Sequence, residues 1–119
     1  MIVAGGRSFV ATNTQKHILM EFAERHDVTH VVTGGCSGAD QVGKRFCERY
    51  GHQYVEFPVS KMQWKVIGKS AGPRRNRSMA EYADLLFLFP GGKGTASMKA
   101  IAEDEGLVIF ECPNQEAAR

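Results

Sequence analysis

The stretch VVTGGCSGAD, residues 31–40, joins an apolar run to a glycine-rich turn and then to the start of a helix. From Ala39 to Tyr50 the apolar residues recur at steps of three and four, which is the spacing of one buried helix face. Gly51 follows directly and fits the left-handed position that ends many helices. An apolar strand, a glycine turn and an amphipathic helix in this order predict one βα unit of a parallel sheet.

The same order recurs along the whole chain. Short apolar or alternating runs predict strands at residues 1–4, 30–33, 53–57, 85–89 and 107–110. Helical spacing predicts helices at about residues 14–25, 39–50, 74–82 and 94–105, and residues 59–72 are predicted as a basic loop with at most a turn of helix. We therefore expect an α/β fold, a Rossmann-like three-layer sandwich with about five mostly parallel strands and about four helices.

Local signals support three of the predicted helix starts. Thr12 and Gln15 have the spacing of a capping box, and so do Ser37 and Asp40. Pro73 suits the first turn of the helix predicted at 74–82, because that position needs no backbone N–H.

The chain is long enough for one domain with its own core, and it contains no internal repeat or linker. We predict a single Rossmann-like domain over residues 1–112, followed by a polar C-terminal tail at 113–119. Similar folds commonly form dimers, and a homo-oligomer would cover apolar helix faces. The sequence leaves the oligomeric state open.

Charge and cysteine content exclude several classes of protein. The formal net charge of +2 is too small to predict a nucleic-acid partner by itself. Three cysteines without CxxC spacing, and four scattered histidines, predict neither a disulfide framework nor a metal site. Reduced thiols, a strand-like start in place of a signal peptide, and the lack of an apolar run of about 20 residues predict a cytoplasmic protein without a membrane partner. No cofactor is predicted.

Three predicted strands end in glycine-rich turns, which read Gly5-Gly6-Arg7, residues 34–40, and residues 90–95. In an open α/β sheet, ligands bind beyond the carboxyl ends of the strands. Glycine lets the backbone approach a phosphate closely, and a following helix offers free N–H groups to an anion. Lys93 and Thr95 add an ammonium group and a hydroxyl to the third turn. Together the three turns predict a phosphate-binding site.

A P-loop is a poorer explanation for these glycines. Residues 38–44 have its spacing, but Arg45 stands where the motif needs Ser or Thr for magnesium. Gly43 also lies on the stripe of its helix that is predicted to be buried.

Basic residues cluster between residues 65 and 77 and suggest contacts to an anion. On the predicted helix, Arg74 and Arg77 share one side while Arg75 points away, so at most one or two of these arginines should reach the ligand. Asn76 is expected to hydrogen-bond a base or ribose, and Lys69 to lie at the mouth of the site.

Other side chains of the same region are predicted mainly as packing residues. Trp64 is expected to cover a hydrophobic edge in preference to stacking on a base. Met62, Met79 and Met98 are expected in the core or in a pocket wall.

The glycine turns, together with GKSAGPRRN at 68–76, Met79-Ala80 and FPGGKGT at 89–95, resemble the YspA/YpsA-related branch of the SLOG superfamily. The resemblance spans residues 5–95. It implies a Rossmann-like fold and a nucleotide-type ligand. Lonely-guy phosphoribohydrolases and the DNA-binding DprA/Smf proteins belong to the same superfamily.

The chain departs from the catalytic relatives at one position. Lonely-guy enzymes carry PGGxGTxxE, whose glutamate works at the ribose, and Met98 occupies that position here. A thioether can neither act as a general base nor stabilise an oxocarbenium ion. Arg74, Arg75 and Asn76 lie about where those enzymes have an arginine for phosphate. The resemblance therefore implies binding more strongly than catalysis.

Three functions follow as hypotheses. The first is a binder of a nucleotide or nucleotide-derived ligand, acting as a sensor, carrier or sequestering protein. The second is a nucleotide N-glycosidase-type hydrolase that uses Asp40, the candidate catalytic residue, or another acid in place of the missing glutamate. The third, which the low aromatic content of the basic stretch disfavours, is a DprA-like nucleic-acid binder. The residues expected at the ligand are Gly5, Gly6, Arg7, Gly34, Gly35, Ser37, Gly38, Asp40, Lys69, Arg74, Asn76, Pro90, Gly91, Gly92, Lys93, Gly94 and Thr95.

Overall fold

A computed structural model describes residues 1–114, so residues 115–119 of the tail predicted at 113–119 lie outside the described residues. Five strands form one parallel sheet in the order β3-β2-β1-β4-β5. The strands are β1 (Ile2–Ala4), β2 (His30–Thr33), β3 (Gln53–Glu56), β4 (Leu85–Leu88) and β5 (Val108–Glu111). The predicted α/β fold with a parallel sheet is confirmed.

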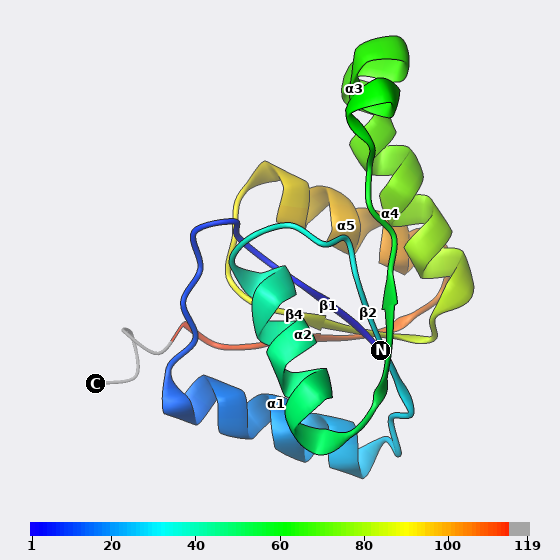
Figure 1. Cartoon of the computed structure of the whole chain (residues 1–119). Helices are drawn as coiled ribbons and strands as arrows, with labels where there is room; N and C mark the ends of the chain where they lie inside the picture. The colour runs from blue at the N-terminus through cyan, green and yellow to red at the C-terminus, as the bar shows by residue number, and fades with distance from the viewer. Residues whose placement is uncertain (115–119) are drawn as a thin grey trace.

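Helices cover both faces of this sheet (Figure 1). The elements are α1 (Asn13–Arg25), α2 (Ala39–Tyr50), α3 (Lys61–Ile67), the 3₁₀ turn η1 (Gly68–Ser70), α4 (Ala71–Tyr82) and α5 (Lys93–Asp104). The chain moves outward from β1 to β3 and then in the opposite direction from β4 to β5. Because such crossovers are right-handed, α1 and α2 lie on one face, and α4 and α5 on the other.

Two hydrophobic clusters correspond to these two faces. Val3 and Phe87 pack in one cluster with residues of α1 and α2, such as Leu19 and Phe46. The neighbouring residues Ile2 and Leu86 point the opposite way and pack with residues of α4 and α5. All four residues of β4 are buried, which is typical of a central parallel strand covered on both sides.

The segment after β3 contains more helix than the sequence analysis predicts. The loop predicted at 59–72 is wrong, because α3 and η1 occupy most of it and α4 begins at Ala71 instead of Arg74. The described residues therefore hold five α-helices rather than about four. Ser60 and Gln63 form a capping box that satisfies free N–H groups at the start of α3, and this signal is readable in the sequence.

The predicted start of α1 is confirmed. The Thr12 hydroxyl accepts a hydrogen bond from the Gln15 N–H at 3.1 Å, and the Gln15 side chain accepts one from the Thr12 N–H at 3.0 Å. The Gln15 amide also donates to the carbonyl of Pro113, so α1 holds the first residue of the segment predicted as a tail.

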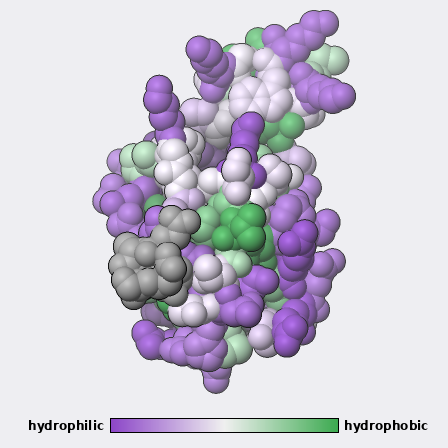
Figure 2. Space-filling view, turned by 90° about the vertical axis from the view of Figure 1, so that its left-hand side faces the viewer, coloured by the Kyte–Doolittle hydropathy of each residue, from purple (hydrophilic) through white to green (hydrophobic). Residues whose placement is uncertain are grey.

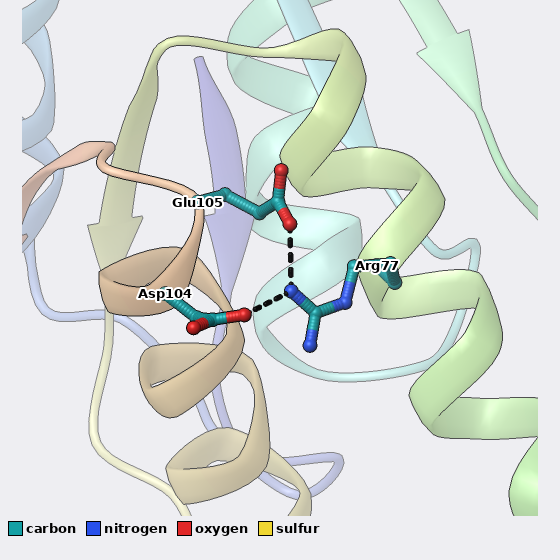
Figure 3. A network of polar contacts seen from close by, with 3 residues as sticks. All are labelled: Arg77, Asp104 and Glu105. Atoms are coloured by element: carbon teal, nitrogen blue, oxygen red, sulfur yellow. Dashed lines mark hydrogen bonds and ion pairs between the residues drawn. The ribbon is translucent and has the colours of Figure 1, made fainter.

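Charged side chains join α4 to the end of α5. Arg77 contacts Asp104 and Glu105, each at 2.6 Å, and Figure 3 shows its guanidinium between the two carboxylates. These hydrogen bonds raise the pKa of Arg77. Because Arg77 is engaged here, it is not part of the basic surface that the sequence offers to an anion. None of the helices in residues 1–114 has the length and hydrophobicity needed to span a bilayer.

Gly43 allows α2 to pack closely on the centre of the sheet. A Cβ atom at this position would lie 2.8 Å from the Cβ of Val3 and 3.2 Å from Cγ2 of Thr33. Real Cβ atoms do not approach that closely, so any side chain here would push α2 away from β1. This contact explains why a glycine interrupts the apolar stripe of α2.

We expect Gly43→Ala to lower the free energy of unfolding by about 1–3 kcal/mol, because overpacking strains the α2–β1 contact. Gly94→Ala is the matched control, since a Cβ at Gly94 meets no atom within 4 Å and Gly94 also lies in a helix. Urea denaturation of both variants measures the difference. Equal stability of the two variants would contradict the close contact at Gly43.

Candidate functional site

A cavity of about 510 Å³ opens at the carboxyl ends of β1 and β4. These two strands are neighbours, but the chain leaves them toward opposite faces of the sheet. Ligands of open α/β sheets bind at such a switch point, because the two diverging connections leave a crevice between them. The floor of the cavity comes from the strand ends, and its walls come from α3, η1, α4 and the start of α5.

The cavity brings together more than half of the predicted ligand residues. They come from all three glycine turns and from the basic segment. Those that line it are Gly5, Gly6, Arg7, Asp40, Lys69, Asn76, Gly92, Lys93, Gly94 and Thr95. The predicted residues that do not line it are Gly34, Gly35, Ser37, Gly38, Arg74, Pro90 and Gly91.

The glycine turns outside the cavity wall support the turns that form it. Gly6 lies between the other two turns, donating its N–H to the Pro90 carbonyl at 2.9 Å and accepting from the Ala39 N–H at 3.1 Å. Ser37 donates its hydroxyl to the Arg7 carbonyl at 2.9 Å. Gly38 has a φ of +72°, and a Cβ there would collide with the carbonyl of Gly6. These residues shape the site through backbone contacts.

Asp40 holds the second glycine turn in place. The capping box predicted for Ser37 and Asp40 is wrong, because Gly38 is the N-cap of α2 and no side chain caps that helix. Instead, Oδ2 of Asp40 accepts hydrogen bonds from the N–H groups of Gly34 (3.1 Å) and Cys36 (3.0 Å). Only 8% of Asp40 is exposed, and burial raises its pKa even though the two N–H groups and the charges of Arg75 and Arg7 lower it.

Arg75, and not Arg74, is the arginine of α4 that lines the cavity. Its Nη1 donates to the carbonyls of Gly34 (3.0 Å) and Phe57 (3.3 Å), and its Nε donates to Oδ1 of Asn76 (2.9 Å). Arg74 is exposed and lies away from the cavity, which corrects the expected orientation of this helix. Ala71, Arg75 and Met79 recur at steps of four residues and share one face of α4, and of these Arg75 and Met79 line the cavity.

The cavity is strongly cationic. Arg7, Lys69, Arg75 and Lys93 line it, and Asp40 is the only carboxylate among its lining residues. Within residues 1–114, none of these four cations forms an ion pair. The first N–H groups of α5 also lack a side-chain cap. Unpaired cations and the N-terminus of a helix together favour an anion with more than one negative charge.

Apolar side chains form another part of the wall. Met79 and Met98 are almost fully buried and line the cavity, as expected for core or pocket-wall residues. Met62 is 68% exposed, so the expectation that it lies in the core or in a pocket wall is wrong. Trp64 lines the cavity with 41% of its surface exposed, so it does not cover a hydrophobic edge of the core.

Several lining residues are absent from the predicted ligand set. They are Ala4, Cys36, Trp64, Gly72, Pro73, Arg75, Met79, Ser97 and Met98. Seven of them lie on α3, α4 or α5, and the loop predicted at 59–72 concealed the face presented by α3 and by the first turn of α4. The capping box at Ser60 was the available signal for α3.

Metal-binding side chains do not gather here or elsewhere in the part of the chain that the structure describes. No group of three or more His, Cys, Asp or Glu side chains that could hold a metal ion occurs within residues 1–114. Comparisons of the chain with protein-family models, with curated proteins and with solved structures give no match.

The raised pKa of Asp40 predicts a specific dependence of stability on pH. Because the folded pKa lies above the ordinary value of 3.8, the protonated carboxyl stabilises the folded state below pH 3.8, and this contribution is lost as the pH rises through the folded pKa. We expect the free energy of unfolding of the wild type, relative to Asp40→Asn, to fall as the pH rises from 3.8 through the folded pKa and then to level off. Urea denaturation of both proteins from about pH 3.5 to about pH 7.5 measures it. A relative stability that rises with pH would contradict the raised pKa.

Proposed function

We propose that this protein binds a phosphate-bearing nucleotide, or a ligand derived from one, in the cavity between β1 and β4, and acts as a sensor, carrier or sequestering protein. One observation carries the proposal. Four cations that form no ion pair within residues 1–114, and the uncapped start of α5, surround one partly apolar cavity at the switch point of the sheet. A nucleotide combines the anionic and the apolar character that such a cavity requires.

The phosphate group is assigned to the turn that begins α5. Lys93 and Thr95 line the cavity there and supply an ammonium group and a hydroxyl beside the free N–H groups of the helix. Gly92 and Gly94 precede and follow Lys93, and no atom lies within 4 Å of a Cβ built at either glycine. This open space supports close approach of a phosphate to the backbone.

Polar groups suited to ribose line the same cavity. Oδ2 of Asp40 accepts two backbone N–H groups, whereas its Oδ1 has no hydrogen-bond partner in the described part of the chain. Asn76 uses its carbonyl oxygen to accept from Arg75, and its NH₂ group stays available as a donor. A free carboxylate oxygen and a free amide donor match the hydroxyl groups of a sugar.

Binding without turnover is favoured over hydrolysis because of Met98. This side chain is 2% exposed and lines the cavity where the catalytic relatives in the resembled superfamily carry a glutamate. The resemblance of the glycine motifs to the SLOG superfamily also supports a nucleotide-type ligand. A hydrolase is the second candidate, since the raised pKa of Asp40 would suit a proton donor.

A thermal-shift screen tests the proposal directly. Purified protein is mixed with nucleoside mono-, di- and triphosphates, NAD, ADP-ribose and cyclic dinucleotides, and each mixture is then separated by liquid chromatography. We expect at least one compound to raise the melting temperature with increasing dose and to be recovered intact. Release of free base would support the hydrolase instead. A panel without any shift would overturn nucleotide binding.

Lys93→Gln tests the assignment of the phosphate. We expect this variant to bind the best compound of the screen at least about tenfold more weakly, because a charge-assisted contact to phosphate is lost. Lys16→Gln, an exposed position on α1 outside the cavity, makes the same change in net charge and should leave the affinity unchanged. Equal weakening by both variants would indicate a general charge effect. Isothermal titration calorimetry measures both affinities.

A further inference from the structure

The helix α3 contributes nothing to the hydrophobic core. None of its residues is buried, and Met62 and Val66 are 68% and 74% exposed. In Figure 1, α3 and the start of α4 project from the rest of the domain, and in Figure 2 the same arm forms the top of the molecule with mostly hydrophilic side chains. Since α3 does not stabilise the core, its presence requires another explanation.

Those ends are well specified by local sequence. The Ser60–Gln63 capping box starts α3, and Gly68, with a φ of +74°, ends it. Since a left-handed residue of this kind favours glycine, the position of α3 relative to α4 depends on Gly68. Local signals thus define the two ends of a short helical arm beside the cavity.

Trp64 is the residue of α3 that lines the cavity. One edge of its indole lies over Gly72, where an added Cβ would be 3.4 Å from Cη2 of the ring. The ring therefore lies close to the start of α4, and a side chain at Gly72 would come into contact with it. Trp64 as a whole residue is 41% exposed, which is a large exposed fraction for an aromatic residue. Neither burial nor a hydrogen bond within residues 1–114 explains this tryptophan.

The walls of the cavity differ in chemical character. The start of α5 and the turn after β1 supply cations through Lys93 and Arg7, whereas α3 supplies an aromatic ring through Trp64. Met79 and Met98 add apolar surface to the same cavity. A ligand that joins a phosphate to a planar heteroaromatic ring would satisfy both kinds of wall.

We propose that Trp64 is the platform on which the base of the ligand stacks, and that α3 exists to hold it over the cavity. This inference rests on the proposed function and makes it more specific. Stacking on an aromatic face discriminates little between bases, because every base has a π face. The site is therefore assigned to nucleotides as a class, with weak discrimination among the four common bases at Trp64.

The experiment uses the fact that Trp64 is the only tryptophan of the chain. AMP, GMP, CMP and UMP, and ribose 5-phosphate as the matching ligand without a base, are titrated into the wild type. Calorimetry gives the affinity of each compound, and tryptophan fluorescence reports on the indole itself. We expect all four nucleotides to quench the fluorescence, and ribose 5-phosphate to bind more weakly without quenching it.

Substitutions of Trp64 then separate stacking from other effects. We expect Trp64→Ala to lower the affinity for the nucleotides about tenfold or more and to leave the affinity for ribose 5-phosphate unchanged. Trp64→Phe should retain most of the affinity for the nucleotides. Val66→Ala is the matched control on the same helix, because Val66 does not line the cavity. Circular dichroism confirms that each variant is folded.

The outcomes distinguish the inference from the function on which it rests. Nucleotides that bind the wild type and Trp64→Ala equally well, without quenching, would overturn stacking but leave the phosphate site intact. Equal affinity of the wild type for ribose 5-phosphate and for the nucleotides would also overturn stacking and leave the phosphate site intact. If none of the five compounds binds and the wider screen is also silent, the proposed function and the stacking inference both fail.

Discussion

The backbone of Gly6 is the point on which the site depends. Its N–H donates to the carbonyl of Pro90 and its carbonyl accepts from the N–H of Ala39, so one residue joins the turns after β1, β2 and β4. Gly5 lies in equally confined space, since a Cβ there would be 2.8 Å from the Cβ atoms of Ala39 and Phe89. Side chains at these positions would separate the turns and open the floor of the cavity.

This arrangement also explains why only part of each glycine motif faces the cavity. A turn that contacts a ligand needs a second layer of backbone to hold it, and Gly38 and Gly91 provide that layer behind Gly6. Asp40 acts in the same layer through Oδ2, which keeps the turn after β2 in position. Its other oxygen is left for a ligand, so one carboxylate serves both structure and binding in the proposed function.

The positive charge of the site depends on the different surroundings of two arginines of α4, Arg75 and Arg77. Arg77 forms ion pairs with Asp104 and Glu105, whereas Arg75 forms none within residues 1–114. Carbonyl groups hold Arg75 beside the cavity, where its charge also acts on Asp40. Hydrogen bonds to carbonyls orient a guanidinium without cancelling its charge. An anionic ligand would provide the missing countercharge.

Much of the molecule was predictable from local patterns. The apolar runs that became β2 and β4, the stripe of α2 and the Thr12 capping box all follow from short-range periodicity, and they were sufficient to predict a parallel α/β sheet with glycine turns at one edge. Tertiary structure alone decided which side of α4 faces the cavity, the role of Asp40, and the position of Trp64 in the cavity wall. Those features depend on contacts between segments distant in the chain, such as Arg75 with Gly34, and local periodicity contains no information about such contacts.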